Sequence, residues 1–432
     1  MKLTVHLFSS LLLISVLAGA DQPEESPWIR SVRTDADGPV LQIASRRYVA
    51  PRDSDAPAVW LVGVTHIGSA SYYAGLTELL SGCDIVLYES VMPEGARPPK
   101  GADDVQRALA TQASLDLLSQ SAARCVQAGQ PVPEDIASLR DGVSEIDLRL
   151  GGWVDNASVD AWGRPVRFEQ DEEQSMLRIS SMGPDGRHGT SDDLSSEHSV
   201  VIESQAVVEG NVNLQAMLAQ SLGLSYQLDT MPYGDVRWRV SDMSVEAVKE
   251  SFAARGMSFD ELGDMLSGAS MPAQLIKTML AIIPMGDAIS GGGVSDAIKA
   301  VMIELLGTPG LLNLTDQQYG EGFNAVIIVE RNDVPLQDLE EIIAEESEVD
   351  CVAILYGAAH MSDMASRLLA GSHGYTCVET RWDDAIAVDV RNSILEESDF
   401  KSIRRTIRLS LASLKREARQ LREAAAEAAK EK

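Results

Sequence analysis

The sequence predicts an α/β fold that is built on a parallel sheet and interrupted by a smaller α+β domain. A strand–helix–strand pattern fills residues 59–89, and strand-like and helical runs alternate again over residues 323–380. Such alternation is typical of βαβ units, whose crossover connections make neighbouring strands parallel. Over residues 102–199 the alternation stops, so we expect a separate domain inserted between two parts of one core.

The first part of the core contains a short strand at 40–43, a strand at 59–63, a helix at 72–80 and a buried strand at 84–89. A Pro- and Gly-rich segment, residues 93–101, then indicates a linker. In the inserted stretch we expect a helix at 104–127 followed by short elements, and after it helices at 201–222 and 244–306.

The late part returns to the α/β pattern. We expect a strand at 323–329 that ends at Glu330-Arg331-Asn332, and then a helix, a strand, a helix and a strand at 336–344, 351–357, 361–369 and 376–380. The tail, residues 399–432, is charged and amphipathic, with Ile403, Ile407, Leu411 and Leu414 at helical spacing. Core packing or self-association accounts for that helix better than chemistry does.

Composition limits the classes of partner. Hydrophobic residues make up 45% of the 432 residues, which is enough for packed cores in two or three domains. The 36 Lys and Arg residues face 65 Asp and Glu, for a formal net charge of −29. Because such a charge repels nucleic acid and anionic lipid, we expect neither as a partner.

The first 20 residues are typical of a signal peptide. Lys2 precedes an apolar run at 7–17, which is too short to span a bilayer, and Ala18-Gly19-Ala20 fits the cleavage rule. We expect an exported chain, periplasmic or secreted, that begins at Asp21 and keeps no membrane span; the alternative is an uncleaved anchor.

Four cysteines occur and none forms a CxxC pair, so a zinc ribbon is not indicated. Export permits disulfides, and Cys83, Cys351 and Cys377 lie in or just before strand-like runs. A bridge and a buried free thiol both remain open for them.

Two histidines follow strands in the same way. His66 ends Gly63-Val64-Thr65-His66, and His360 ends Gly357-Ala358-Ala359-His360. A side chain just past the carboxyl end of a parallel strand lies where α/β sheets bind ligands. Glu89 also ends a strand, so we expect these three potential ligands at one sheet edge, with Arg331 and Asn332 ending a fourth strand there.

These motifs resemble the TraB/Tiki family, which is related to the GumN and erythromycin-esterase-like proteins. The resemblance covers roughly residues 57–92 and 201–390 and includes the late Glu-Arg-Asn block followed by Tyr-Gly-Ala-Ala-His. It implies a metal-dependent hydrolase, a peptidase acting on a peptide or exported protein. By motif, His66 and His360 would be metal ligands, Glu89 a ligand or general base, and Arg331, with Asn332, part of the catalytic set.

The chemistry of these residues is consistent with that implication. Imidazoles and a carboxylate suit Mn, Co or Zn. Such an ion generates a nucleophile from water at neutral pH, and Glu89 could accept the proton. A guanidinium such as that of Arg331 offers fixed donors to a developing oxyanion.

The inserted stretch has a motif of its own. Asp160-Ala161-Trp162-Gly163-Arg164-Pro165 precedes a Gly-rich loop at 180–194, and together they resemble the major pseudopilin, protein G, of type II secretion. Asp185, Asp192 and Asp193 supply carboxylates in that loop, and Ca²⁺ prefers such oxygen ligands. A solvated acidic turn is the alternative. Nothing before Asp104 supplies the hydrophobic helix of a working pseudopilin, so we expect an accessory module that does not polymerise.

The sequence thus divides into a signal peptide (1–20), a first core part (21–92), an inserted calcium-binding domain (102–199), a second core part (201–395) and a charged C-terminal helix (396–432). The leading hypothesis is a metal-dependent hydrolase. The second is a non-catalytic exported binding protein that uses the inserted domain to recognise a partner.

Overall fold

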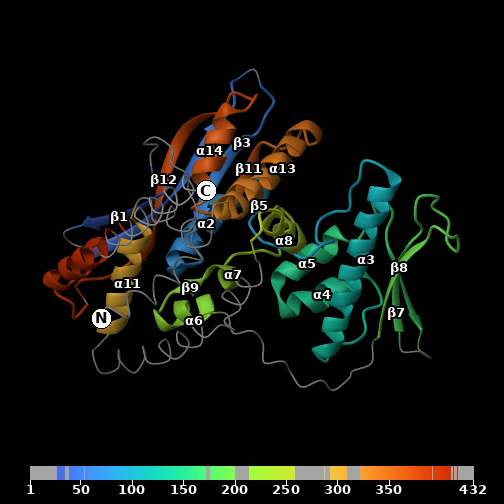
Figure 1. Cartoon of the computed structure of the whole chain (residues 1–432), viewed down its shortest axis with the longest axis horizontal. Helices are drawn as coiled ribbons and strands as arrows, with labels where there is room; N and C mark the ends of the chain where they lie inside the picture. Colours follow the sequence, from blue (N-terminus) through green and yellow to red (C-terminus); the bar gives the residue numbers. More distant parts are fainter. Residues whose placement is uncertain are drawn as a thin grey trace, which may run out of the picture. The chain divides into compact units, whose positions relative to one another are not determined.

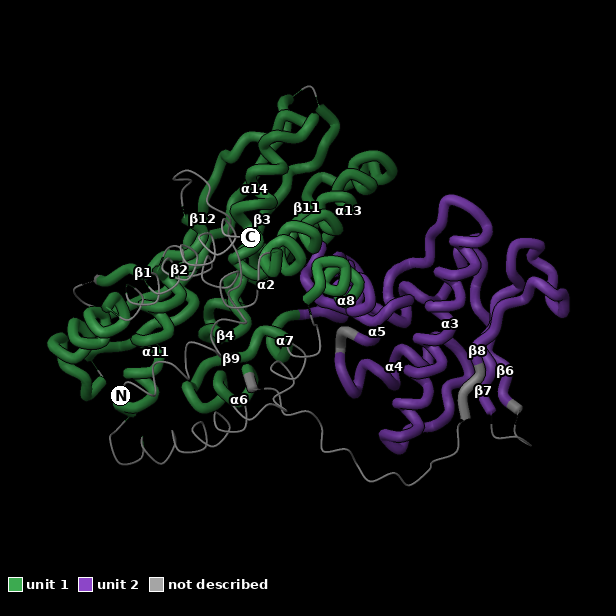
Figure 2. The backbone as a smooth tube through the Cα atoms, in the orientation of Figure 1, with its two compact units in different colours: residues 1–86, 211–231, 249–432 green, residues 87–210, 232–248 purple. Residues whose placement is uncertain are grey.

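The computed structural model describes residues 27–34, 38–52, 54–171, 176–199, 214–257, 287, 292–308, 322–391, 393–409, 412 and 416. The expected signal peptide, the start of the helix expected at 201–222, much of the stretch expected to be helical at 244–306, and Leu411 and Leu414 of the tail lie outside the described residues. The chain divides into two compact units (Figure 2): unit 1 is Met1–Val86, Asn211–Met231 and Lys249–Lys432, and unit 2 is Leu87–Gly210 and Pro232–Val248.

Unit 1 is organised by a mixed sheet with a parallel centre (Figure 1). Its strand order is β1 (Ile29–Thr34), β2 (Gly38–Val49), β3 (Ala58–Val64), β11 (Cys351–Gly357) and the first half of β5 (Ile85–Tyr88), and β12 (Thr376–Ala387) pairs with β2. The second half of β5 and its neighbour β10 (Trp238–Val240) belong to unit 2. β3 and β11 are parallel, whereas β2 is antiparallel to β1, β3 and β12. The predicted α/β class with a parallel central sheet is therefore confirmed. The strands expected at 40–43 and 376–380 are found as parts of β2 and β12, but their antiparallel direction was not predicted.

The central strands β3 and β11 are buried along their whole length except at the first residue of each. Val59, Leu61 and Val62 of β3 have no exposed surface, and neither do the residues from Val352 to Tyr356 of β11. Near-continuous hydrophobic runs of this kind are typical of parallel strands covered on both faces. The sequence therefore located these two strands to within a residue at each end.

The helices of the core connect or flank these strands. They are α2 (Ala70–Ser81), α6 (Leu214–Ser221), α7 (Gln227–Thr230), α8 (Val245–Ala254), α11 (Gly293–Leu306), α13 (Arg331–Glu345) and α14 (Met361–Ala370), with a small pair of strands, β4 (Ile67–Gly68) and β9 (Ser225–Tyr226). α2 begins at Ser69, whose hydroxyl accepts from the Tyr72 amide at 3.2 Å. The start of the tail, residues 397–409, is helical, and Ile407 in it is buried.

The strand expected at 323–329 is wrong. Ala325–Glu330 forms a π-helix that continues directly into α13. Its Val- and Ile-rich sequence favours a strand, but Phe323 packs on Phe252 of α8 with ring centroids 5.6 Å apart, and Val326 is buried one turn later. Tertiary packing at helical spacing thus overrides local β propensity. Arg331 and Asn332 consequently begin a helix and do not end a strand.

Unit 2 contains a long helix against a small antiparallel sheet. The helix α3 (Asp104–Gln127) has the predicted bounds and begins at Asp103, whose carboxylate accepts from the Gln106 amide at 2.9 Å. α3 packs on β7 (Met176–Ser181) and β8 (Leu194–Ser199), and β6 (Arg167–Asp171) completes the sheet. Two further helices, α4 (Ile136–Ile146) and α5 (Leu148–Asn156), were not predicted.

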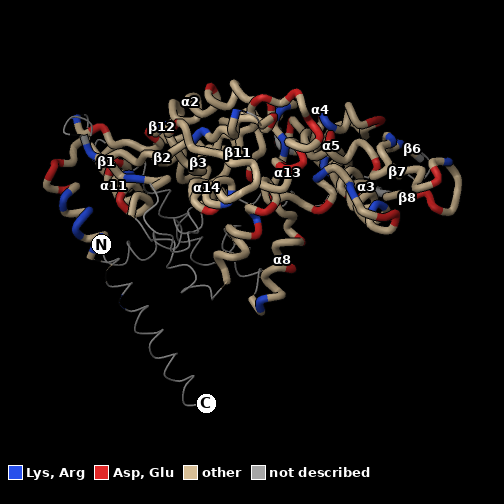
Figure 3. Tube along the Cα trace, turned by 90° about the horizontal axis from the view of Figure 1, so that it is seen from above, with Lys and Arg blue, Asp and Glu red and all other residues tan. Residues whose placement is uncertain are grey.

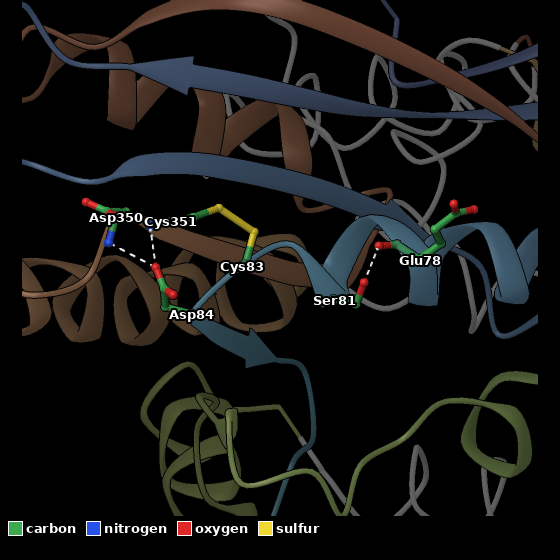
Figure 4. Close-up of a disulfide and its surroundings, with 6 residues drawn as sticks. All are labelled: Glu78, Ser81, Cys83, Asp84, Asp350 and Cys351. Atoms are coloured by element: carbon green, nitrogen blue, oxygen red, sulfur yellow. Dashed lines mark hydrogen bonds between the residues drawn. A yellow bond between two sulfur atoms is a disulfide. The ribbon is translucent and has the colours of Figure 1, made fainter.

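A disulfide joins Cys83 to Cys351 at the start of two neighbouring strands (Figure 4). Beside it, the Asp84 carboxylate accepts from the amides of Asp350 and Cys351 at 2.9 and 3.0 Å. Because β5 and β11 begin side by side here, they run in the same direction, and the sheet is cross-linked at the end opposite the histidine loops. Among the described cysteines Cys125 is free and buried, and Cys377 is free and exposed.

Charge is distributed over both units. Figure 3 shows Asp and Glu residues on each unit with Lys and Arg interspersed among them. Within the described residues no helix is both long and apolar enough to cross a membrane.

We expect the disulfide to stabilise unit 1 measurably. Its two cysteines are 268 residues apart, so the bridge closes a long loop in the unfolded chain. The double variant Cys83→Ser/Cys351→Ser should lose about 2–4 kcal/mol of unfolding free energy, measured by denaturant titration. Reductant should weaken the wild type to the same level and leave the variant unchanged. Cys377→Ser is the matched control, and equal stability of all three proteins would contradict the assignment.

Candidate functional site

The two histidine loops leave adjacent parallel strands at the same end. In the register of β3 and β11, Val64 pairs with Gly357, the last residue of each strand. His66 therefore lies two residues beyond one strand and His360 three residues beyond its neighbour. Paired strands are separated by roughly 4.8 Å, so the two loops begin next to each other. The Ala358 amide donates to the Val64 carbonyl at 2.9 Å and joins them.

The backbone of the first loop is held by three hydrogen bonds from two helices, α2 and α7. The Gly63 carbonyl accepts from the Tyr72 hydroxyl at 3.2 Å, and the Thr65 carbonyl accepts from the Tyr73 hydroxyl at 2.7 Å. The His66 carbonyl accepts from the Gln227 amide at 2.9 Å. Since both tyrosines are buried in α2, water does not compete for these bonds. The loop is thus a fixed platform for His66.

Glycine is required at the start of this loop for a steric reason. A Cβ on Gly63 would lie 2.9 Å from the Ala44 carbonyl oxygen and 3.0 Å from the Ile43 side chain. The neighbouring strand β2 therefore excludes any larger residue.

Each histidine ring is oriented by a side-chain amide. The Nδ1 atom of His66 lies 2.9 Å from Oε1 of Gln227, and Nδ1 of His360 lies 2.7 Å from Oδ1 of Asn332. An amide oxygen only accepts, so Nδ1 is the donor in both rings. The neutral imidazole then has its lone pair on Nε2, which is the arrangement of a histidine that binds a metal through Nε2.

Asn332 therefore has a different place from the one predicted. It has no exposed surface and lies in the first turn of α13, from which it reaches His360. This geometry makes it a residue that acts through His360. Arg331, next to it, is also buried, and its guanidinium donates to the Ile327 carbonyl at 3.4 Å.

The predicted ligands are not all in one unit. His66, His360, Arg331 and Asn332 belong to unit 1, whereas Glu89 belongs to unit 2, directly after β5. Glu89 is half-buried, and the preceding Tyr88 carbonyl accepts from the Ser241 amide at 3.1 Å. Within the described part of the chain, no group of three or more His, Cys, Asp or Glu side chains is placed to hold a metal ion.

A small apolar pocket lies beside the two loops. It has room for about one water molecule. Its lining combines loop residues with residues of β1, β2 and α11: Ile29, Leu41, Ile43, Val64, Thr65, Leu306, Ala358 and Ala359.

The three aspartates of the unit 2 loop converge on one hydroxyl. Oγ1 of Thr190 lies 2.6 Å from an Asp192 oxygen, 3.3 Å from Asp193 and 3.4 Å from Asp185. Backbone amides hold the carboxylates: Asp185 donates to Asp192 at 3.0 Å, and Gly189 donates to Asp193 at 2.7 Å. The Thr190 hydroxyl, followed by the Asp185 amide, lowers the pKa of Asp192 and favours its ionised form.

The start of this loop is organised by a buried carboxylate whose role the sequence did not reveal. Asp160 accepts from the amides of Trp162 and Arg164 at 3.0 and 2.8 Å and from the Ser181 hydroxyl at 2.7 Å. It thereby ties the turn before β6 to the end of β7. Gly183, which follows, has a φ of +58°, and a Cβ there would lie 2.1 Å from the Asp192 carbonyl oxygen.

The side-chain partner of His66 and the tyrosines that hold its loop were not among the predicted site residues. Gln227 and the tyrosines of α2 had no sequence signal, because each meets its loop only through folding.

Comparison with protein families, curated proteins and solved structures found no match for this chain.

We expect Asp160→Ala to destabilise unit 2 by about 1–3 kcal/mol, because buried donors would be left without an acceptor. Asp160 is only 3% exposed, so water cannot replace the carboxylate. Thermal and denaturant unfolding would measure the loss. Asp141→Ala, at an exposed ion pair with Arg140, is the control and should change stability little. Similar stability of the two variants would contradict the role given to Asp160.

Proposed function

We propose that this protein is an exported metal-dependent hydrolase, a peptidase of the TraB/Tiki type, with a pseudopilin-like calcium-binding module. One observation carries the proposal. Two histidines follow adjacent parallel strands at the same end, and each donates its Nδ1 proton to an amide oxygen. An ordinary structural histidine needs no such paired arrangement.

The donor set suits the proposed metal. His66 and His360 would bind Mn, Co or Zn through Nε2, and Gln227 and Asn332 would hold the rings. The ion, when bound, supplies Lewis-acid chemistry for hydrolysis. Two ligands do not complete a site, and Glu89 is the carboxylate that the family resemblance implies. The roles of Glu89 as ligand or base and of Arg331 as a donor to the reacting carbonyl stay predictions.

Two features support the other parts of the proposal. The Cys83–Cys351 bridge fits an oxidising compartment, as export requires. In unit 2, three carboxylates gathered by Thr190 offer the hard oxygen ligands that Ca²⁺ prefers.

The alternative is a non-catalytic exported protein whose core is inert and whose unit 2 recognises a partner. Purified mature protein, tested on a peptide library with and without Mn²⁺ or Co²⁺, separates the two functions. Metal-dependent cleavage supports the hydrolase. No cleavage with either metal supports the binding protein.

We expect His66→Gln and His360→Gln each to lose metal. Removal of a direct ligand should weaken Mn²⁺ binding by more than the roughly 10–100-fold typical of losing an outer partner. Calorimetric titration of the metal-free protein would measure the affinity. His373→Gln is the matched control, because that histidine pairs with Glu340 at 2.7 Å. Unchanged affinity in both site variants would exclude the site.

We expect calcium to stabilise unit 2 selectively. At a hundredfold excess of Ca²⁺ over its dissociation constant, a ligand that binds only the folded state adds about 2.7 kcal/mol. Melting in EGTA should therefore show an early transition that disappears when Ca²⁺ is restored. Asp192→Ala and Asp193→Ala should abolish the response, whereas Asp141→Ala should keep it. Identical melting curves with and without EGTA would contradict the calcium site and favour a solvated acidic turn.

A further inference from the structure

A chain of polar contacts runs outward from His360. Nδ1 of His360 contacts Asn332 Oδ1, and Nδ2 of Asn332 donates to Asp363 Oδ2 at 2.8 Å. Asp363 in turn accepts from Arg367 at 3.4 Å. These residues come from the first turn of α13, the loop after β11 and the first two turns of α14, so the chain joins three parts of unit 1.

The direction of the Asn332 amide decides which nitrogen of His360 has the proton. With Oδ1 toward the ring, Nδ1 must donate, and the lone pair of the neutral ring is on Nε2. With the amide reversed, Nδ2 would donate to Nδ1, and the proton would move to Nε2. Because Asn332 is fully buried, water cannot compensate for a wrong orientation.

Asp363 opposes the reversed orientation. A carboxylate only accepts hydrogen bonds, so turning Oδ1 of Asn332 toward Asp363 would place two oxygens at the present 2.8 Å separation. The His360 carbonyl, 3.3 Å from Nδ2 of Asn332, acts in the same sense but is neutral and more distant. Hydrogen bonds to charged groups are roughly twice as strong as neutral ones. Asp363 is therefore the main determinant of the amide direction.

Arg367 keeps that carboxylate in place. It contacts Asp363, forms an ion pair with Asp333 of α13 and donates to the Val329 carbonyl at 3.3 Å. Asp363 is also in the first turn of α14, where the helix dipole favours a negative charge.

We propose that Asp363 is a positioning residue that fixes the Asn332 amide and thereby keeps the lone pair of the neutral His360 ring on Nε2, the atom through which the proposed divalent cation would bind. The use of that lone pair rests on the proposed function. The position of the proton does not, because it can be measured in the metal-free protein. An ordinary acidic residue at a helix start, paired only with Arg367, would leave the tautomer of His360 unaffected.

The test is nitrogen NMR of the metal-free mature chain labelled with ¹⁵N-histidine, at a pH where the ring is neutral. His360→Gln identifies the His360 signals. In the wild type the proton should be on Nδ1. In Asp363→Ala the ratio of the Nδ1–H to the Nε2–H form should fall roughly tenfold, as expected for loss of one hydrogen bond to a charged group. Asp363→Asn keeps an acceptor without the charge and should give an intermediate ratio.

The matched control is Asp333→Ala. Asp333 is also an acid in the first turn of a helix and also pairs with Arg367, but it has no hydrogen bond to Asn332 among those found. Its removal should leave the His360 ratio unchanged. Titration with Mn²⁺ gives the second readout: affinity should fall about 10–100-fold in Asp363→Ala and stay at the wild-type value in Asp333→Ala.

An Nε2–H form in the wild type, or an unchanged ratio in Asp363→Ala, would overturn the proposal. If Asp363→Ala does not fold, as judged by its melting transition, Asp363→Asn decides: no rise of the Nε2–H form would overturn it equally. If the ratio of the Nδ1–H to the Nε2–H form falls from the wild type through Asp363→Asn to Asp363→Ala, but none of these proteins binds Mn²⁺, the positioning role is supported and the metal site is refuted. If the wild type binds Mn²⁺ but the ratio is the same in all three proteins, the metal site is supported and the positioning role of Asp363 is refuted.

Discussion

The parallel pairing of β3 with β11 is the constraint on which the rest of the structure depends. The two strands are separated by almost 300 residues of sequence, yet their last residues, Val64 and Gly357, are paired. Their register alone brings the two histidine loops to one end of the sheet. A shift of one residue would exchange the two buried faces of a strand, so that the packing on each face and the contact between the loops would be lost. At the other end, the disulfide and Asp84 cross-link β11 to β5.

Burying the polar groups around the histidines costs free energy unless each group has a hydrogen-bond partner. This requirement fixes how the side chains at the site are oriented. Asn332 is buried and uses both ends of its amide, on His360 and on Asp363. A buried polar network in which some groups lack hydrogen-bond partners is less stable than an apolar core. We therefore expect such a network where the orientation of its side chains matters for function. The same reasoning applies in unit 2, where one carboxylate oxygen of Asp160 accepts from its own turn and the other accepts from Ser181 at the end of β7.

The sequence predicted the elements that have a strong local signal. Strands β3 and β11 are uninterrupted hydrophobic runs, and α3 begins at an aspartate cap and has the expected bounds. The strand expected at 323–329 was wrong, because the β-branched residues after Gly322 form a π-helix whose packing partners lie on another helix. The histidine loops were visible as a repeated motif. Asn332 was also named, as part of the catalytic set, but its contact with His360 was not predicted. Gln227 and Asp363 were not named, since no periodicity encodes a contact between elements that are distant in sequence.

The proposed metal site requires that His66 and His360 bind one divalent ion through Nε2. X-ray absorption at the cobalt edge of the Co²⁺-loaded mature chain tests it most directly, because imidazole ligands give a characteristic outer-shell scattering. We expect scattering from two imidazoles in the wild type and from one in either His66→Gln or His360→Gln. A spectrum without imidazole scattering, or one that neither substitution changes, would contradict it.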